Sequence, residues 1–275
     1  PRQVYKVPGV LAGGEGGLLG LAVSPTYPQD RWVYAYHTAS RDNRIVRFRL
    51  DGGPPEVIFD GISRASFHNG GRIAFGPDGL LYAGTGDAGV RGSSQDPADP
   101  NGKILRLTPD GDPAPGNPTA GSPVFSLGHR NVQGLAWDSQ RRLYATEFGQ
   151  NRLDEVNLIE PGRNYGWPQV EGPGTGGGRF TAPLVTWSTA EASPSGAAIA
   201  GDTLYVAALR GQRLWTVRLR DGRTERPRAE LSRRYGRLRS VAVAPDGSLW
   251  VSTSNRDGRG DVRAGDDRLL RFPLG

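Results

Sequence analysis

The sequence predicts an all-β fold of the β-propeller class, and three observations support this. A short apolar strand motif occurs five times, with an alanine at the same place in every copy and separations of 52, 62, 62 and 44 residues. A turn and an aromatic-bearing strand follow each copy. The 41 glycines and 22 prolines interrupt any long helical pattern. Repeated strand pairs joined by Pro-Asp-Gly turns at this period are typical of propellers.

The first two strands of each repeat can be located from the shared alanine. The motif copies are Gly20–Pro25, Arg72–Gly79, Gly134–Asp138, Gly196–Asp202 and Ser240–Gly247, with the alanine at Ala22, Ala74, Ala136, Ala198 and Ala242. The strands after the turns carry Tyr34, Tyr82, Tyr144, Tyr205 and Trp250 in register. We therefore expect five strand pairs of the same construction.

A third strand is expected in each repeat, towards the rim. Apolar and polar residues alternate with a period of two in Arg44–Phe48, Lys103–Leu107, Glu155–Leu158, Arg213–Val217 and Arg268–Phe272. This alternation indicates a strand that is buried on one face. A β-sandwich with chance similarity between strands is the competing interpretation, and five aligned copies favour the propeller.

The repeats run from end to end, so we expect residues 1–275 to form a single β-propeller domain. The segment Pro1–Leu11 is interpreted as the tail of a truncated N-terminal blade. No run of eighteen apolar residues is present, which predicts no membrane span. The chain has no cysteine, which excludes disulfides, thiolate ligands and cysteine nucleophiles.

The formal net charge of +6 comes almost entirely from arginine, because the lysines are Lys6 and Lys103 alone. The arginines are dispersed and many fall at strand ends, so most are interpreted as solvated strand faces. No basic stripe with interleaved aromatics is present, so no nucleic-acid partner is expected. Arginines that converge on loops could instead hold a small anion, because their planar guanidinium donates two parallel hydrogen bonds.

Two loops before inner strands carry histidine. His68 lies in Phe67–Arg72, and His129 lies one repeat later in Leu127–Gly134. The equivalent positions favour a functional role, whereas each histidine taken alone fits a structural role, and both interpretations remain open. The loop Gly13–Gly20 would let the backbone approach a ligand, but it lacks the Lys-Ser/Thr pair of a phosphate loop.

Carboxylates and exposed carbonyls gather in Glu147–Asn157, which Gly162–Pro168 follows. A hard cation such as calcium uses such oxygen ligands. The segment lacks the spacing of an EF-hand loop, and turn hydrogen bonds by Asp and Asn would explain it equally well.

Together these motifs resemble a known family. The segments Gly17–Gly20, His68–Arg72, Gly128–Gly134 and Asn164–Pro168 are similar, in order, to those of the soluble pyrroloquinoline quinone (PQQ)-dependent glucose/aldose sugar dehydrogenases. The resemblance implies a six-bladed propeller that holds PQQ and calcium. It also implies oxidation of the C1 hydroxyl of an aldose to the lactone, transfer of electrons to an external acceptor, a periplasmic or secreted location, and a monomer or homodimer.

The resemblance also implies roles for residues near the quinone. His68 matches the catalytic base, and Arg130 and Asn131 match the pair that bonds the quinone oxygens. Glu15 stands at a cofactor-side position where the glucose dehydrogenases have glutamine, and Phe67 stands where they have aspartate. The loss of that polar contact predicts a broader range of aldoses.

Further positions match cofactor and metal contacts of the family. Arg210, Arg237 and Arg239 match cationic contacts to the cofactor carboxylates. The carbonyls of Gly149 and Gln150 match ligands of the cofactor's calcium, and Glu155 and Tyr165 resemble part of a second, structural calcium site.

Two other functions remain alternatives at this point. A non-catalytic propeller that binds a protein or a glycan would keep the fold without binding a quinone. A calcium-dependent lactonase would need carboxylates at several inner strand ends, where this sequence has arginines and a histidine instead.

Overall fold

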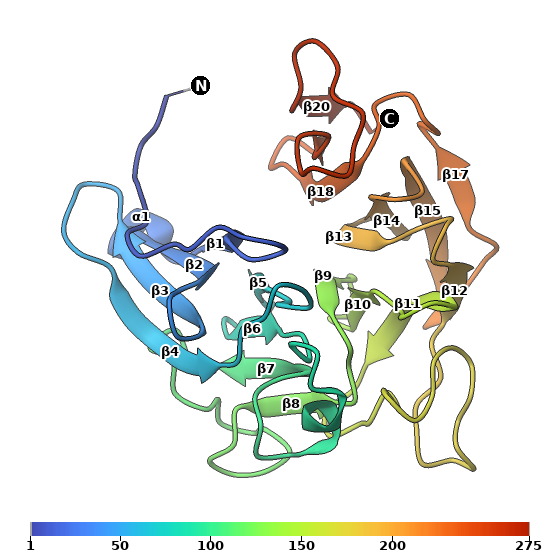
Figure 1. Ribbon diagram of the computed structural model, residues 1–275, viewed down its shortest axis with the longest axis horizontal. Coiled ribbons are helices and arrows are strands. Elements are labelled where there is room, and N and C mark those ends of the chain that lie inside the picture. The colour runs from blue at the N-terminus through green and yellow to red at the C-terminus, as the bar shows by residue number, and fades with distance from the viewer. Residues whose placement is uncertain (1, 275) are drawn as a thin grey trace. The chain divides into compact units, whose positions relative to one another are not determined.

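A computed structural model describes residues 2–274. In these residues the strands form five sheets, accompanied by a four-residue helix, α1 (Tyr27–Asp30), and a short 3-10 helix, η1 (Arg91–Gln95) (Figure 1). The chain divides into two compact units. The first consists of Pro1–Val132, Glu160–Gln169 and Gly177–Phe180, and the second of Gln133–Ile159, Val170–Gly176 and Thr181–Gly275. Among the described residues, no helix has the length and apolar character needed to cross a membrane.

The first unit contains two four-stranded antiparallel sheets in simple sequential order. One sheet consists of β1 (Leu18–Val23), β2 (Trp32–Thr38), β3 (Asn43–Arg49) and β4 (Glu56–Ile62). The other consists of β5 (Arg72–Phe75), β6 (Leu81–Gly84), β7 (Lys103–Leu107) and β8 (Val124–Leu127). This meander of neighbouring antiparallel strands is the construction of a propeller blade.

The second unit contains the other three sheets, apart from Val132. The third sheet consists of β9 (Val132–Trp137), β10 (Leu143–Glu147), β11 (Leu153–Ile159) and β12 (Val185–Ser188). The fourth consists of β13 (Pro194–Ala200), β14 (Thr203–Ala208), β15 (Arg213–Arg220), β16 (Arg223–Thr224) and β17 (Arg228–Glu230), and the fifth of β18 (Leu238–Val243), β19 (Leu249–Thr253) and β20 (Leu269–Phe272). The predicted first, second and third strands are confirmed in all five sheets.

The strand register explains the repeated alanine. It lies directly opposite the repeated aromatic residue in the pairs Ala22↔Tyr34, Ala74↔Tyr82, Ala198↔Tyr205 and Ala242↔Trp250. Cross-strand neighbours share one face of the sheet, so a small partner leaves room for the ring. The repeated alanine and aromatic residue are therefore explained by side-chain packing between the first two strands of the sheet.

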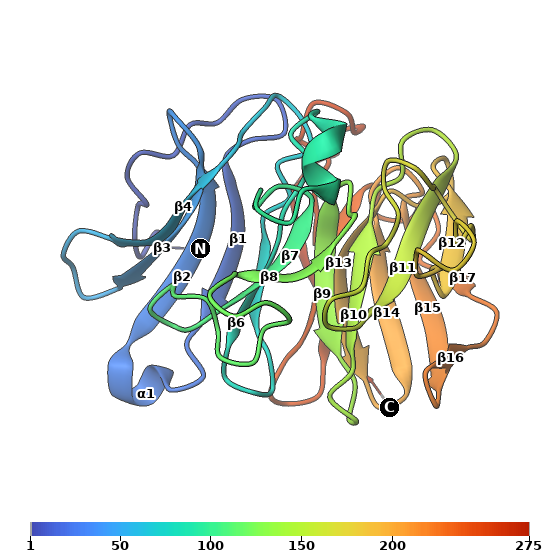
Figure 2. The same cartoon turned by 90° about the horizontal axis from the view of Figure 1, so that it is seen from below.

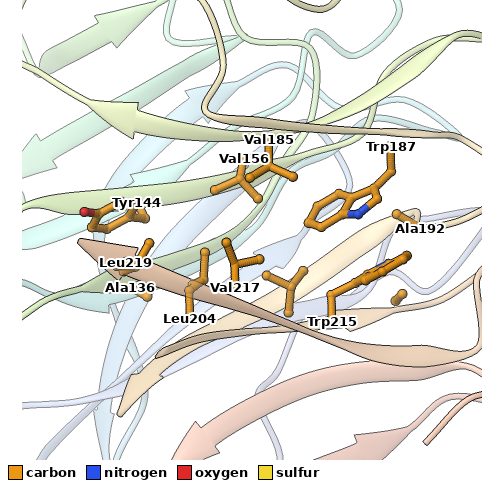
Figure 3. Close-up of a cluster of buried hydrophobic side chains, with 12 residues drawn as sticks. Ala136, Tyr144, Val156, Val185, Trp187, Ala192, Leu204, Trp215, Val217 and Leu219 are labelled. Atoms are coloured by element: carbon orange, nitrogen blue, oxygen red, sulfur yellow. The ribbon is translucent and has the colours of Figure 1, made fainter. Parts of the chain in front are cut away.

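Each unit has its own apolar core. In the second unit, Trp187 from β12 stacks on Trp215 from β15 with ring centroids 5.2 Å apart, beside Val156 and Val217 (Figure 3). In the first unit, a cluster that includes Tyr36, Ile45, Ile73 and Leu105 joins the two sheets. Burying each such side chain contributes about 1.5–3 kcal/mol, so these clusters dominate the stability of the sheets.

The structure adds outer strands that the sequence did not predict. β4, β8, β12 and β17 pair with the third strands of their sheets. These strands carry no repeated motif, and three of them have only three or four residues. The predicted third strands are consequently paired on both sides in four sheets and do not form the sheet edges.

The polar loops of the first unit lie at one end of its sheets. Because the strands are antiparallel, a first strand begins where the second strand ends, so the loops before β5 and after β6 are neighbours. Helix α1 lies at the opposite end, between β1 and β2 (Figure 2). The loop ends before the first strands therefore hold the candidate site.

Candidate active site

The loop that carries His68 is held in an unusual backbone conformation. His68 has φ = 54°, in the left-handed region that non-glycine residues rarely adopt. Its N–H donates to Oε2 of Glu15 at 3.0 Å, and its carbonyl accepts from the N–H of Ala88 at 3.1 Å. Gly14 lies against the carbonyl of Ser66, where a Cβ would collide. Such strain costs of order 1–3 kcal/mol and persists where the surrounding contacts fix it, often at functional sites.

His68 is paired with a carboxylate. Its Nδ1 lies 2.7 Å from Oδ1 of Asp87, and the two side chains are 16% and 1% exposed. The Gly89 N–H and the Trp167 indole N–H, at 2.8 and 2.9 Å, also donate to Asp87. Burial raises the pKa of Asp87, but the bonds from His68, Gly89 and Trp167 outweigh it, and the pKa lies below its usual value. Asp87 is therefore an anion that orients the imidazole.

Trp167 connects this pair to Arg130. The guanidinium carbons of Arg130 and Arg91 lie 5.4 and 5.5 Å from its ring centroid, within range of cation–π attraction. The carbonyl of Arg130 also accepts the N–H of Asp87 at 2.9 Å. Gln95 donates to the carbonyl of Trp167 at 2.6 Å and fixes its backbone. His68, its carboxylate partner Asp87 and the cationic side chain of Arg130 thus belong to one connected group.

Asn131 holds the same loop from the other side. Its Oδ1 accepts the N–H of Gly70 at 3.0 Å, which ties the Asn131 side chain to the residue two places after His68. Gly70 packs on the backbone of Thr85, and a Cβ on Gly86 would overlap the carbonyl of His68. The backbones on either side of His68 therefore approach as closely as glycine allows.

A buried amide network underlies the His68 loop. The side chain of Asn69, next to the histidine, donates to the carbonyl of Ala65 at 2.8 Å and accepts from the Ala65 N–H and from Asn43, each at 3.0 Å. Its own carbonyl accepts the hydroxyl of Tyr36 at 2.9 Å. The Asn of the His-Asn-Gly-Gly sequence thus anchors the base loop to β2 and β3.

The two histidines that the sequence could not separate have different roles. His129 is fully buried, its Nε2 lies 2.8 Å from Oγ of Ser126, and its ring stacks on Tyr165 with centroids 4.8 Å apart. The hydroxyl of Tyr165 accepts the N–H of Glu160 at 2.9 Å. His129 is therefore a packing residue, and His68 is the histidine with a partly exposed ring.

A buried lysine supports the loop above β7. Lys103 is fully buried, and its Nζ donates to the carbonyls of Ser93 and Asn101 at 2.7 and 2.8 Å. Burial lowers its pKa to about 8, and the nearby Asp99 and Asp96 oppose this effect. Lys103 therefore joins helix η1 to the strand that follows it.

In the second unit, Asp257 holds two of the predicted cofactor arginines. Its Oδ2 accepts from Nε of Arg237 at 2.9 Å and lies 3.4 Å from Nη2 of Arg239. Nε of Arg239 also donates to Oγ of Ser254 at 2.9 Å. Burial raises the pKa of Asp257, but the Arg259 N–H and the two arginines lower it by more. The pKa therefore lies below its usual value, and the group stays charged. The cluster therefore keeps one net positive charge.

Arg210, the third arginine predicted to contact the cofactor, lies in the second unit on an exposed turn after β14. The N–H of Leu209 donates to the carbonyl of Ser193 at 3.0 Å, and the N–H of Gly211 donates to that of Ala192 at 3.0 Å. These bonds fix the backbone on both sides of Arg210, so the turn presents its side chain outward.

The loop of Gly149 and Gln150 is fixed by a single carboxylate. Oε1 of Glu171 accepts four backbone N–H groups, those of residues 150, 151, 152 and 153, at 2.9–3.2 Å. In a trans peptide the carbonyl points opposite to the N–H. Because the N–H groups of Gln150 and Asn151 point at Glu171, the carbonyls of Gly149 and Gln150 point away from it. Two neighbouring carbonyl oxygens are thus presented on one side of the loop.

Glu155 faces another carboxylate. It lies opposite Glu147 in the β10–β11 register, and both side chains are buried. The N–H of Gly172 and the amide of Asn157 donate to Glu155 at 2.7 and 3.1 Å. Burial, followed by Glu147, raises the pKa of Glu155. Tyr165 belongs to the other compact unit, so its predicted pairing with Glu155 in a calcium site stays a prediction.

Comparison with known proteins identifies the family. The glucose/sorbosone dehydrogenase family profile matches residues 1–270. The chain belongs to this family. The PQQ-bound structure of an aldose sugar dehydrogenase from Streptomyces coelicolor is 55% identical, with a TM-score of 0.94 over 98% of this chain and 83% of that chain. The Escherichia coli K12 aldose sugar dehydrogenase YliI is 28% identical over 92% of this chain and 78% of that protein. Quinoprotein glucose dehydrogenase B of Acinetobacter calcoaceticus is 31% identical over 62% and 44% of the two chains.

These similarities confirm the predicted all-β propeller class and the predicted dehydrogenase family. The single-domain prediction stays untested, because the two compact units are described separately. Sequence reasoning missed Asp87 and Trp167, which position His68 in the first unit, and Glu171, which orders the loop of Gly149 in the second unit. The sequence held a signal for Trp167, which belongs to the motif Asn164–Pro168, and Asp87 lies in the loop after β6. Glu171 lies in a glycine-rich segment without a recognisable motif.

The residues fit the cofactor that this family resemblance implies. PQQ is a quinone with three carboxylates, so it needs several cationic contacts and donors for its oxygens. In the first unit Arg130 and Asn131 have side chains of the kind that make such contacts, and in the second unit Arg210, Arg237 and Arg239 do. In residues 2–274, no three His, Cys, Asp or Glu side chains gather as a metal site, so calcium would depend on carbonyl oxygens such as those of Gly149 and Gln150.

Proposed function

We propose that this protein is a PQQ-dependent aldose sugar dehydrogenase. It oxidises the C1 hydroxyl of an aldose to the lactone and passes two electrons to an external acceptor. The observation that carries this proposal is the His68–Asp87 pair, which shares Trp167 with Arg130 in a chain of the glucose/sorbosone dehydrogenase family. PQQ supplies the two-electron oxidant when bound.

His68 acts as the general base on the sugar. Because Nδ1 faces the anionic carboxylate of Asp87, the proton of a neutral imidazole resides on Nδ1, and Nε2 is the atom that takes the C1 hydroxyl proton. Removing that proton makes loss of the C1 hydrogen with its electron pair easier. The resulting imidazolium is stabilised by Asp87, which the Trp167 and Gly89 donors keep charged.

The cations of this chain bind and orient the cofactor. Arg130 would place positive charge, and Asn131 an N–H donor, where negative charge develops on the quinone oxygens. Arg237 and Arg239, aligned by Asp257, would hold its carboxylates together with Arg210. Glu15 supports the site indirectly, since its carboxylate fixes the His68 backbone.

We propose calcium as a second cofactor. The carbonyls of Gly149 and Gln150 are the ligands that the Glu171 contacts orient, and the facing carboxylates of Glu147 and Glu155 favour a cation in the same unit. The second calcium site predicted at Glu155 and Tyr165 is part of this proposal. We also propose a periplasmic or secreted location, on the basis of the family resemblance.

His68→Gln provides the test of this function. Turnover with glucose and other aldoses should fall by roughly a hundred- to ten-thousandfold, since a general base contributes that much. PQQ binding, followed by its absorption spectrum, should be almost unchanged because the arginines remain. His37→Gln, at the buried histidine of β2, controls for loss of stability. A His68→Gln protein that binds PQQ and still oxidises aldoses at the parent rate would refute the assignment.

A further inference from the structure

Positive charge is concentrated in the last quarter of the chain. Residues 210–275 contain 16 arginines and 8 acidic side chains, whereas the other 209 residues contain 18 basic and 20 acidic side chains. Arginines therefore outnumber the acidic side chains twofold in this part of the sequence. Nothing in the sheet packing requires the excess, because many of these side chains are exposed.

Five of these arginines lie on two adjoining loops of the second unit. We call them the arginine loop surface: Arg233, Arg234, Arg256, Arg259 and Arg263, all exposed. Nη1 of Arg263 donates to the carbonyl of Arg234 at 3.0 Å, which joins the loop before β18 to the loop before β20. The surface is thus continuous across both loops.

Backbone carbonyls hold two of these guanidinium groups. Arg256 donates to the backbone carbonyl of Asp266 at 2.6 Å, and Arg263 donates to the carbonyl of Arg234. A carbonyl oxygen carries no formal charge, so these two bonds do not offset the charge of Arg256 or Arg263, and the nearby carboxylate that acts on Arg263 is that of Asp266. Asp257, the carboxylate at the centre of the region, is already shared by Arg237 and Arg239.

The surface is continuous with the predicted cofactor contacts. The N–H of Arg259 donates to Oδ1 of Asp257 at 3.0 Å, while Oδ2 of the same carboxylate holds Arg237 and Arg239. Asp257 alone would therefore lie between a partner bound to the arginine loop surface and the arginines that we propose hold the cofactor carboxylates. Electron transfer requires this kind of proximity.

We infer that the arginine loop surface docks the acidic face of a redox protein that removes the electrons of sugar oxidation, an inference that rests on the proposed function. Oxidation of one aldose to its lactone releases two electrons and two protons, so two one-electron acceptor proteins are reduced in turn. Several guanidinium groups spread over two loops suit an extended acidic surface. Complementary charge steers such partners and raises their association rate by about 10- to 1,000-fold at low salt.

The first experiment uses the unmodified holoenzyme with glucose and compares two redox proteins as probes. These are plastocyanin, which has an acidic face, and mitochondrial cytochrome c, which has a basic face. The second-order rate constant for plastocyanin should exceed that for cytochrome c at low salt and fall at least about tenfold with added salt, because the attraction is screened. Equal rates, or a plastocyanin rate that does not respond to salt, would overturn the inference.

The second experiment localises the effect. Arg233→Glu, Arg256→Glu and Arg263→Glu are combined in one protein. The control combines Arg218→Glu, Arg223→Glu and Arg228→Glu, which change the net charge equally on β15, β16 and β17 of the fourth sheet. The loop variant should lose at least about tenfold in plastocyanin reduction, within the range of steering effects, and the control should retain most of it. Equal losses in both proteins would overturn the inference.

A further measurement separates this inference from the proposed function. Reduction of bound PQQ by glucose, followed spectroscopically without any acceptor, should be the same in the parent and loop variant. If that step fails in the parent, the proposed function fails and the inference with it. Ferricyanide serves as the small-anion probe. If the loop variant slows ferricyanide and leaves plastocyanin unchanged, the surface attracts small anions and does not dock a protein.

Discussion

Trp167 donates its indole N–H to Oδ2 of Asp87 at 2.9 Å, on the carboxylate oxygen that His68 does not contact. The same indole ring lies 5.4 Å from the guanidinium carbon of Arg130. One tryptophan therefore contacts both the carboxylate partner of His68, the proposed base, and Arg130, the proposed cation for the quinone oxygens. Its place in the sequence, 80 residues after Asp87, shows that the site depends on contacts between distant segments.

Trp167→Phe should slow turnover while leaving PQQ affinity nearly unchanged. Phenylalanine keeps a ring beside Arg130 but removes the donor to Asp87, and a hydrogen bond to a charged group contributes about 1.5–3 kcal/mol. We expect kcat to fall by roughly tenfold or more. Steady-state kinetics and a spectral titration with PQQ would check this. Trp187→Phe, in the other unit, is the control, and an equal loss of kcat there would indicate a general packing effect.

Gly86→Ala should displace the His68 loop. A Cβ at this position overlaps the carbonyl of His68, so either the loop or the backbone after β6 must move. Since a displacement of about 1 Å can cost a hundredfold in rate, activity should fall far more than stability does. Gly92→Ala is a matched control, because a Cβ there meets no atom within 4 Å. A Gly86→Ala enzyme as active as Gly92→Ala would contradict the close approach.

Glu171→Gln should weaken calcium binding. The neutral amide still offers one oxygen to the four N–H groups of residues 150–153, but without the charge that makes those bonds strong. A less ordered loop presents the carbonyls of Gly149 and Gln150 less well, and we expect calcium affinity to fall by about tenfold. Isothermal titration of the PQQ-loaded protein would measure it. Glu160→Gln, on an exposed ion pair with Arg163, should leave the affinity unchanged.

Lys103 should make stability depend on pH in the alkaline range. Burial lowers its pKa to about 8, whereas an unfolded lysine has a pKa near 10.4. Between these values the unfolded chain binds more protons than the folded chain, so the contribution of Lys103 to the free energy of unfolding rises with pH. Urea unfolding across this range would measure the slope, which Lys103→Met should lack. Identical slopes in both proteins would show that another group titrates.

The repeat was readable from the sequence because its cause is local. Each alanine and its aromatic partner lie on consecutive strands of the chain, so the same side-chain pairing recurs from copy to copy. The outer strands β4, β8, β12 and β17 were not predicted, because they carry no repeated motif, and β8, β12 and β17 have only three or four residues. Their pairing depends on the backbone N–H and C=O groups of the third strand more than on the hydrophobic pattern of the outer strand itself.

Within the site, the sequence distinguished residue types and the structure distinguished roles. His68 and His129 occupy equivalent loops, and only tertiary packing shows that one faces Asp87 while the other is buried against Tyr165. Asp87 itself carried no signal, because an aspartate after a strand fits an ordinary turn equally well.

The sequence by itself determined the all-β class, the five repeats, the family resemblance and the identity of the candidate base, because each follows from local patterns or from motifs in a fixed order. The tertiary structure decided which charged groups act together: Asp87 with His68 and Trp167, Asp257 with Arg237 and Arg239, and Glu171 with the loop of Gly149. The physical reason is that hydrogen bonds and ion pairs act over about 3–4 Å, and such distances between remote segments are fixed only when the sheets have packed.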